Sequence, residues 1–124
     1  LDFLANHEAV GWVRHPDLPD HPNHAVAQRQ LPKGTTSMIV FGVKGGFDAG
    51  RKLINSVKLA SHVSNVGDAK TLLVHPASTT HMQLGPEQRK LAGVPDDMIR
   101  LSVGIEHVDD IIDDLRASLR VSQR

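Results

Sequence analysis

Apolar residues follow a strand pattern in some stretches of the chain and a helical pattern in others. The longest apolar run, Ser37–Val43, lies between glycines and predicts a central strand. Met98–Val103 alternates apolar and polar residues, which predicts a strand with one apolar face. A helix is predicted from His107 to about Leu119, because apolar residues recur there at helical spacing: Val108, Ile111, Ile112, Leu115 and Leu119.

The shorter strands are bounded by residues that disfavour continued pairing. Val10–Arg14 is a candidate strand that breaks at Pro16, and Thr71–Val74 is a strand that stops before Pro76. Proline lacks the N–H group that a central strand donates to its neighbour. Leu59–Val63 is expected to be extended as well.

Caps and helix breakers predict three shorter helices. Asn23 can cap a helix over Ala25–Leu31, and Gly85-Pro86 opens a helix of two turns at most. Asp48 can cap a helix with an apolar face made of Ala49, Leu53, Ile54 and Val57. The order of elements predicts an α+β fold, in which a small mixed or antiparallel sheet has helices packed on one face.

Composition limits the classes of protein to consider. The 124 residues are the size of one domain, so residues 1–124 are expected to share a single core. Fourteen basic residues balance fourteen acidic ones, which disfavours nucleic acid and anionic membranes as partners. No Cys is present, and no apolar run approaches the roughly 20 residues that span a bilayer. We therefore expect a cytoplasmic protein.

The start of the chain predicts that more polypeptide precedes it. Leu1 stands where an initiator Met would be, and Leu1–Val10 is compatible with a helix. We expect this segment to be the end of a connecting helix and the chain to be a piece of a longer protein.

Arg100 is the polar residue that the alternation places most clearly. If Ile99 and Leu101 face the terminal helix, the Arg100 side chain projects from the opposite face of its strand. One hypothesis is a solvated arginine or an ion pair with Asp68 or Glu106. The other is a carboxylate clamp, because a guanidinium offers two parallel N–H donors that match a carboxylate.

Polar loops and histidines supply the remaining candidate chemistry. Ala77–His81 has hydroxyl and imidazole groups but no apolar anchor, so we expect it to contact the carboxylate and cofactor end of an amino-acid substrate. His75 and His81, at the two ends of this loop, are expected to be hydrogen-bonded structural histidines. Three histidines could form a zinc site, but their unspecific spacing and the absence of Cys favour a polar, turn-rich loop: His15, His21 and His24.

Four segments stand out along the chain: Phe41–Gly46, Ser64–Thr71, His75–His81 and Arg100–Glu106. The last two together are a highly specific combination. Over nearly the whole chain, the sequence resembles the pyridoxal-phosphate-dependent enzymes of Cys/Met metabolism. It is most similar to their O-acetylhomoserine sulfhydrylase branch. In the γ-lyase and cystathionine synthase branches, Ser-Leu-Gly is usual where Asn65-Val-Gly67 stands here, and this departure favours the sulfhydrylase branch.

The resemblance implies the small C-terminal, substrate-binding domain of a fold-type I enzyme. It implies that Arg100 grips the substrate α-carboxylate and that Asn65 and Thr80 line the same pocket. Pyridoxal phosphate would be bound by the missing large domain, the rest of the same polypeptide, in an enzyme that is usually a homotetramer. The reaction so implied replaces the acetate of O-acetylhomoserine with sulfide or a thiol, giving homocysteine or methionine.

The resemblance also implies what the chain lacks. The family's Schiff-base lysine follows Ser-x-x, which precedes no lysine here, and the chain has no Tyr to stack on the cofactor. We therefore expect no catalytic, cofactor-binding or metal residues in these 124 residues, and no activity from them alone. The alternatives are a domain of a cystathionine γ-synthase or γ-lyase type enzyme, and a non-catalytic α+β interaction domain.

Overall fold

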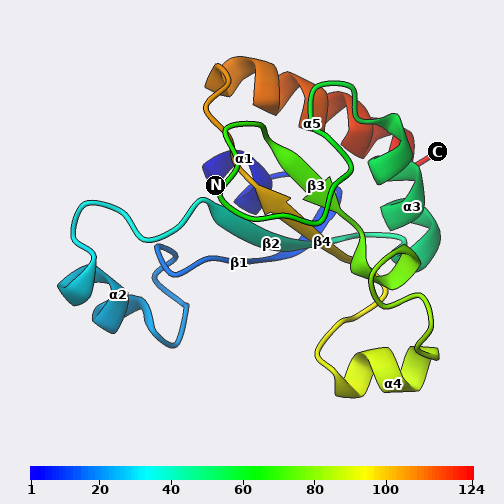
Figure 1. The fold of residues 1–124 in the computed structure, drawn as a ribbon, viewed down its shortest axis with the longest axis horizontal. Helices are drawn as coiled ribbons and strands as arrows, with labels where there is room; N and C mark the ends of the chain where they lie inside the picture. Colours follow the sequence, from blue (N-terminus) through cyan, green and yellow to red (C-terminus); the bar gives the residue numbers. More distant parts are fainter.

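Four antiparallel strands form one sheet in the order β1–β2–β4–β3 (Figure 1). The computed structural model describes residues 1–124. The strands are β1 (Val10–Arg14), β2 (Met38–Val43), β3 (Leu72–Val74) and β4 (Met98–Ser102). The long apolar run becomes β2, which pairs with both β1 and β4 and therefore lies inside the sheet.

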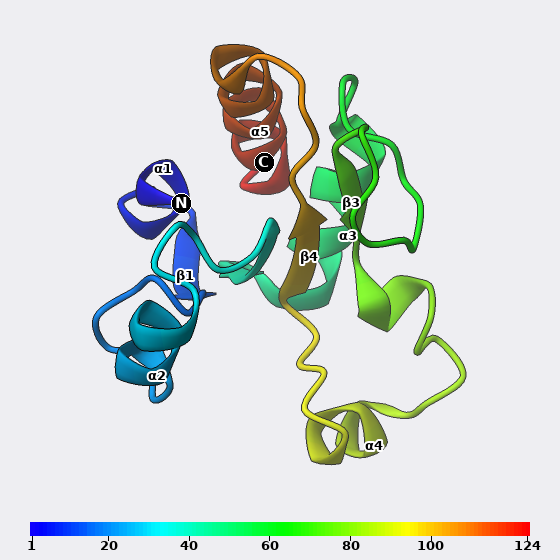
Figure 2. The same cartoon turned by 60° about the vertical axis from the view of Figure 1, so that its left-hand side comes forward.

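Three helices cover one face of this sheet: α1 (Asp2–Ala5), α3 (Gly46–Ser56) and α5 (Val108–Ser122). The core lies between them and the sheet (Figures 1 and 2). Its side chains come from every one of these layers and include Leu4, Phe41, Leu53, Leu101 and Leu119. Burial of this aliphatic cluster is the main force that holds the two layers together. The predicted α+β fold is confirmed.

Two helices project from the layered body, whereas the 3-10 turn η1 (Pro76–Ser78) packs against β4 and α3. The helices are α2 (His24–Gln30), which has no buried residue, and α4 (Pro86–Leu91), in which only Arg89 is buried. Both lie at the end of the molecule away from α5 (Figure 2). The expectation that helices pack on one face therefore applies to α1, α3 and α5.

The predicted cap of α3 is wrong. The helix begins at Gly46, and its N-cap is Gly45, which has a φ of 102°. Gly46 also has a positive φ, of 66°. Two adjacent glycines allow the chain to turn directly from β2 into the helix in a conformation that side chains disfavour. Asp48 lies in the first turn instead, 3.6 Å from Arg51, where its charge suits the helix dipole.

Several other boundaries differ from the sequence prediction. Leu1–Val10 holds only the four-residue α1, and Leu59–Val63 is reduced to one isolated bridge between Ser61 and Leu72. Helix α5 continues to Ser122, and Val108 at its start is 60% exposed. Asn23 does precede α2, but its side chain makes no capping hydrogen bond.

Candidate functional site

The two faces of β4 differ as the alternation predicts. Ile99 and Leu101 are 0% and 1% exposed in the core beneath the helices. Arg100 lies on the opposite face and is half-buried. Cross-strand pairing places it beside Val40 of β2 on one side and Val74 of β3 on the other. The guanidinium therefore projects from the face of the sheet that no long helix covers.

Arg100 forms no ion pair within the chain. Asp68 instead accepts a hydrogen bond from the Lys70 backbone N–H, at 3.1 Å. Glu106 accepts from both the backbone N–H and the hydroxyl of Thr71, each at 2.7 Å. Both expected partners are engaged elsewhere, so the ion-pair hypothesis for Arg100 is wrong. Its donors are free for a carboxylate from outside the chain.

The segment that carries Asn65 lies over the end of β4. The Gly67 N–H donates to the Ser102 hydroxyl at 3.2 Å, and Ser102 is on the same face of β4 as Arg100. Asn65 itself is exposed, and its side-chain oxygen accepts a hydrogen bond from the Val66 N–H at 2.9 Å. The Gly67–Ser102 hydrogen bond thus holds the backbone near Asn65 against β4, whereas the Asn65 side chain makes its hydrogen bond within its own loop.

Thr80 belongs to the loop at the other end of β3. Val74 pairs with Arg100, and the chain then enters η1, which packs against β4. The Thr80 side chain is exposed, and its hydroxyl lies 2.8 Å from Nδ1 of His81. The structure thus places the Asn65 and Thr80 loops at the two ends of the short strand that pairs with Arg100.

A tryptophan that the sequence analysis did not single out covers another part of this face. The Trp12 indole N–H donates to Asp97 at 2.8 Å and reaches it by crossing Gly42. A Cβ at Gly42 would lie 2.0 Å from the indole nitrogen. The Arg14 guanidinium lies 5.2 Å from the Trp12 ring centroid. A single Trp and a glycine inside a strand were the available signals for such a close approach.

His75 is a structural histidine, as predicted. Its side chain is 0% exposed and sits between the Ser78 hydroxyl, 2.8 Å from Nδ1, and the Asp96 carbonyl, 2.7 Å from Nε2. Burial lowers the pKa of His75 below its ordinary value, and the hydrogen bond to Asp96 only partly opposes this shift. The ring is therefore neutral near pH 7.

The three histidines considered for zinc do not converge on one point. His15 Nε2 donates to the Thr36 carbonyl at 3.0 Å, and His24 Nδ1 donates to the Pro16 carbonyl at 2.8 Å. His21 Nδ1 accepts the Asn23 N–H at 3.2 Å. The structure contains no group of three side chains placed to hold a metal ion. Each of these imidazoles instead forms a hydrogen bond with a backbone group of residues 15–36.

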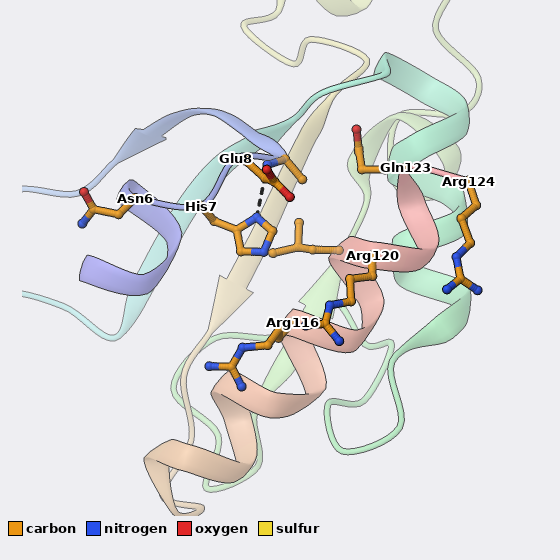
Figure 3. Close-up of a pocket in the computed structure, with 9 residues that line it drawn as sticks. Asn6, His7, Glu8, Arg116, Arg120, Gln123 and Arg124 are labelled. Carbon is orange, nitrogen blue, oxygen red and sulfur yellow. Dashed lines mark hydrogen bonds between the residues drawn. The ribbon is translucent and has the colours of Figure 1, made fainter.

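A groove of about 620 Å³ lies on the helix-covered side, between Asn6–Ala9 and the second half of α5 (Figure 3). Three of its residues are arginines spaced four positions apart: Arg116 and Arg120 of α5, and Arg124 just beyond the end of that helix. Arg116 is already paired with Asp113. Since neither Arg100 nor either of the two flanking loops lines this groove, it is separate from the site on the sheet.

No lysine of the chain is buried in a cleft, although Lys52 borders an open surface pocket. All six are exposed: Lys33, Lys44, Lys52, Lys58, Lys70 and Lys90. Separately, none of the helices has the length and apolar character that a membrane span requires. A covalently held cofactor needs a lysine in a shaped, water-poor pocket. The residues present therefore do not fit a cofactor attachment site.

Comparison with known proteins extends over almost the whole chain. Residues 1–120 match the family described as Cys/Met metabolism PLP-dependent enzyme. The chain is 49% identical over 120 residues to a homocysteine synthase of Schizosaccharomyces pombe, covering 97% of this chain and 28% of that protein. It is 47% identical over 117 residues to O-acetyl-L-homoserine sulfhydrylase 1 of Thermus thermophilus, covering 94% of this chain and 28% of that protein.

A solved structure shares the fold. Cystathionine gamma synthase from Xanthomonas oryzae pv. oryzae, in complex with aminoacrylate and cysteine, superposes with a TM-score of 0.87 at 38% identity. The match covers 98% of this chain and 31% of that chain. The chain thus spans between a quarter and a third of the length of these similar proteins.

Proposed function

Because the chain belongs to the Cys/Met metabolism family of PLP-dependent enzymes, we propose that it is the C-terminal, substrate-binding domain of an O-acetylhomoserine sulfhydrylase. Pyridoxal phosphate is the cofactor of this family. The intact enzyme replaces the acetate of O-acetylhomoserine with sulfide or a thiol. The rest of the same polypeptide holds the cofactor, and the assembled enzyme is a homotetramer.

One observation carries this proposal: the unpaired guanidinium of Arg100 on the helix-free face of the sheet. Valines on both neighbouring strands flank its base, so the charged end is directed away from the sheet. An amino-acid substrate carries an α-carboxylate, which a guanidinium binds through two parallel hydrogen bonds. Arg100 is therefore the residue that holds the substrate by its carboxylate.

The role of Arg100 in the reaction is to orient the substrate. When bound, pyridoxal phosphate supplies the electron sink for chemistry at the substrate α-carbon. A carboxylate held in a fixed direction determines which bond at that carbon is aligned for reaction. Such an orientation effect is worth on the order of 100-fold in rate. Asn65 and Thr80, on the loops at either end of β3, complete the polar lining around the carboxylate.

The choice of the sulfhydrylase branch rests on Asn65-Val-Gly67 and on the names of two similar proteins. A cystathionine γ-synthase is the second candidate, because a solved enzyme of that name has the same fold at 38% identity. The two activities differ in the sulfur nucleophile, which is sulfide or a simple thiol in one and cysteine in the other. Sulfide and cysteine supplied separately to the intact enzyme, with O-acetylhomoserine or O-succinylhomoserine, distinguish them.

Replacement of Arg100 with lysine tests the carboxylate clamp. Arg100→Lys keeps the charge but loses the second parallel N–H donor, so kcat/KM of the intact enzyme for O-acetylhomoserine should fall about 100-fold. The matched control is Arg14→Lys, since Arg14 lies in the same cross-strand row on β1, separated from Arg100 by Val40. This control should change kcat/KM less than about twofold. An unchanged kcat/KM in Arg100→Lys would remove Arg100 from the substrate site.

A further inference from the structure

The buried imidazole of His75 joins its own segment, the end of β3 and η1, to two segments that are distant in the sequence. Its own backbone follows β3, its Nδ1 meets η1 and its Nε2 meets the loop before β4. The second distant segment is α3, which packs against the ring. Together, these segments surround the root of the loop that carries Thr80.

The hydrogen bonds of His75 define one tautomer. The Asp96 carbonyl can only accept, so Nε2 must carry the proton. In the neutral ring, Nδ1 is then an acceptor, and the Ser78 hydroxyl donates to it. Each ring nitrogen therefore has a partner that fits only one orientation of the imidazole. A flipped or displaced ring would leave a buried polar atom without a partner, which is costly.

Helix α3 approaches the ring through a glycine. A Cβ at Gly50 would lie 2.6 Å from Nε2 and 2.8 Å from Cδ2 of His75, closer than real Cβ atoms come. Phe47, on the preceding turn, meets the ring edge-to-face with centroids 5.3 Å apart. The ring is thus held between hydrogen bonds at its two nitrogens and close packing on α3.

The loop beyond His75 is fastened to the same residue. The Thr79 hydroxyl donates to the His75 carbonyl at 2.8 Å, and the His81 N–H donates to the Pro76 carbonyl at 2.9 Å. Thr80 lies between these two attachment points. On the other side of His75, Val74 pairs directly with Arg100. Only His75 and the fastened loop therefore separate Thr80 from the strand position next to Arg100.

Asp96 extends the network to α4. Its carboxylate accepts from Nε and Nη2 of Arg89, at 2.9 and 2.8 Å. Arg89 is 7% exposed and lies over the Phe47 ring at 5.8 Å. The carbonyl that His75 uses thus belongs to a residue that is itself held by an ion pair with the buried Arg89. The acceptor for Nε2 has little freedom to move.

From these contacts we infer that His75 is a positioning residue, which fixes Thr80 relative to Arg100 so that both can address one substrate carboxylate. This inference deepens the proposed function and rests on it. His75 touches neither the substrate nor the cofactor. It acts through the attached loop, and the orientation of its ring sets where that loop begins.

Two variants of the intact enzyme disturb the ring in different ways. His75→Ala removes both hydrogen bonds, and Gly50→Ala pushes the ring without removing any polar group. Lys52→Ala, on the exposed side of the same helix, is the control. Amide hydrogen exchange across residues 76–82 reports the loop, while KM, kcat and the visible absorbance of the bound cofactor report the site.

Both variants should raise exchange in the loop at least tenfold and raise KM for O-acetylhomoserine about tenfold, the equivalent of one lost hydrogen bond. The cofactor absorbance should stay unchanged, as should every property of Lys52→Ala. His75→Gln should recover part of the KM, since its amide can still donate to the Asp96 carbonyl. Partial rescue of this kind is not expected from a merely space-filling side chain.

Unchanged exchange in His75→Ala and Gly50→Ala would overturn the inference, as would raised exchange with KM and kcat both unchanged. A KM increase accompanied by loss of the cofactor absorbance would also overturn it, since it indicates general unfolding. Failure of the proposed function has a separate signature. It appears as an unchanged kcat/KM in Arg100→Lys, whatever the loop exchange of the His75 variants.

Discussion

The carboxylate of Glu106 illustrates how one residue fixes the edge of the site. It accepts hydrogen bonds from the Thr71 N–H and hydroxyl, and the same hydroxyl accepts the Gly104 N–H at 2.9 Å. These bonds join the base of the Asn65 loop to the chain just after β4. Because Glu106 is engaged in this way, it does not neutralise Arg100, which stays available for a ligand.

The stability of this contact should depend on pH. The two hydrogen bonds from Thr71 lower the pKa of Glu106 below its ordinary value. A lowered pKa in the folded state means that the contribution is fully present above the unfolded pKa of about 4.3. It is lost as the pH falls through the lower, folded value. Lowering the pH should therefore reduce the free energy of unfolding more in the native protein than in a Glu106→Gln variant.

Thermal unfolding of the intact protein between about pH 3 and 7 measures this difference. At neutral pH, Glu106→Gln should cost about 1 kcal/mol, the value of a charge-assisted bond replaced by a neutral one. Glu87→Gln is a suitable control, since Glu87 is exposed in α4. If the two variants show the same pH dependence of stability, the role given to Glu106 is wrong.

At the scale of elements, Trp12 crosses over β2 on one face of the sheet and so connects β1 to the start of β4. The indole starts on β1, passes Gly42 of β2 and ends at Asp97, immediately before β4. The crossing is possible only because residue 42 has no side chain. The glycine therefore serves a close approach and not a turn, as its place inside a paired strand indicates.

Gly42→Ala should break the hydrogen bond between Trp12 and Asp97. Its new methyl group would overlap the indole, so we expect a loss of about 1–3 kcal/mol in the free energy of unfolding. Gly11→Ala, on β1, is the matched control, because its Cβ would meet its nearest atoms at an ordinary 3.8 Å. Urea unfolding of the intact protein compares the two. Equal midpoints would mean that the indole does not need the space above Gly42.

At the scale of the whole molecule, the sheet has one face covered by helices and one face that only loops and side chains border. The covered face contains the aliphatic core. The other face presents Arg100, and the chain spans only 28% of the homocysteine synthase it resembles. In our proposal, the remaining part of the polypeptide faces this second surface and brings the cofactor to it.

The isolated 124 residues should consequently show no chemistry of their own. After incubation with pyridoxal phosphate and dialysis, the purified chain should lack a visible absorbance band from a lysine-bound cofactor, because its lysines are all exposed and none is buried in a pocket. The intact enzyme, treated identically, serves as the positive control. A stoichiometric visible band on the isolated chain would contradict the assignment of the cofactor to the rest of the polypeptide.

The sequence by itself determined the layers of the fold. Continuous or alternating apolar residues specified β2, β4 and α5, since burying one face requires a fixed period. The same period placed Arg100 opposite Ile99 and Leu101. Local signals were weaker for the start of α3, where two glycines replaced the expected Asp48 cap. A cap prediction from residue type alone does not include the backbone turn that precedes the helix.

Only the tertiary structure decided which polar groups meet. Asp68 and Glu106 were possible ion-pair partners of Arg100 from the sequence, yet they accept hydrogen bonds from Lys70 and Thr71 instead. The contacts of His75 with Asp96 and Gly50 join residues 21 and 25 positions apart, for which no local pattern exists. Periodicity describes the face on which a side chain lies, whereas its partner depends on how separate elements pack.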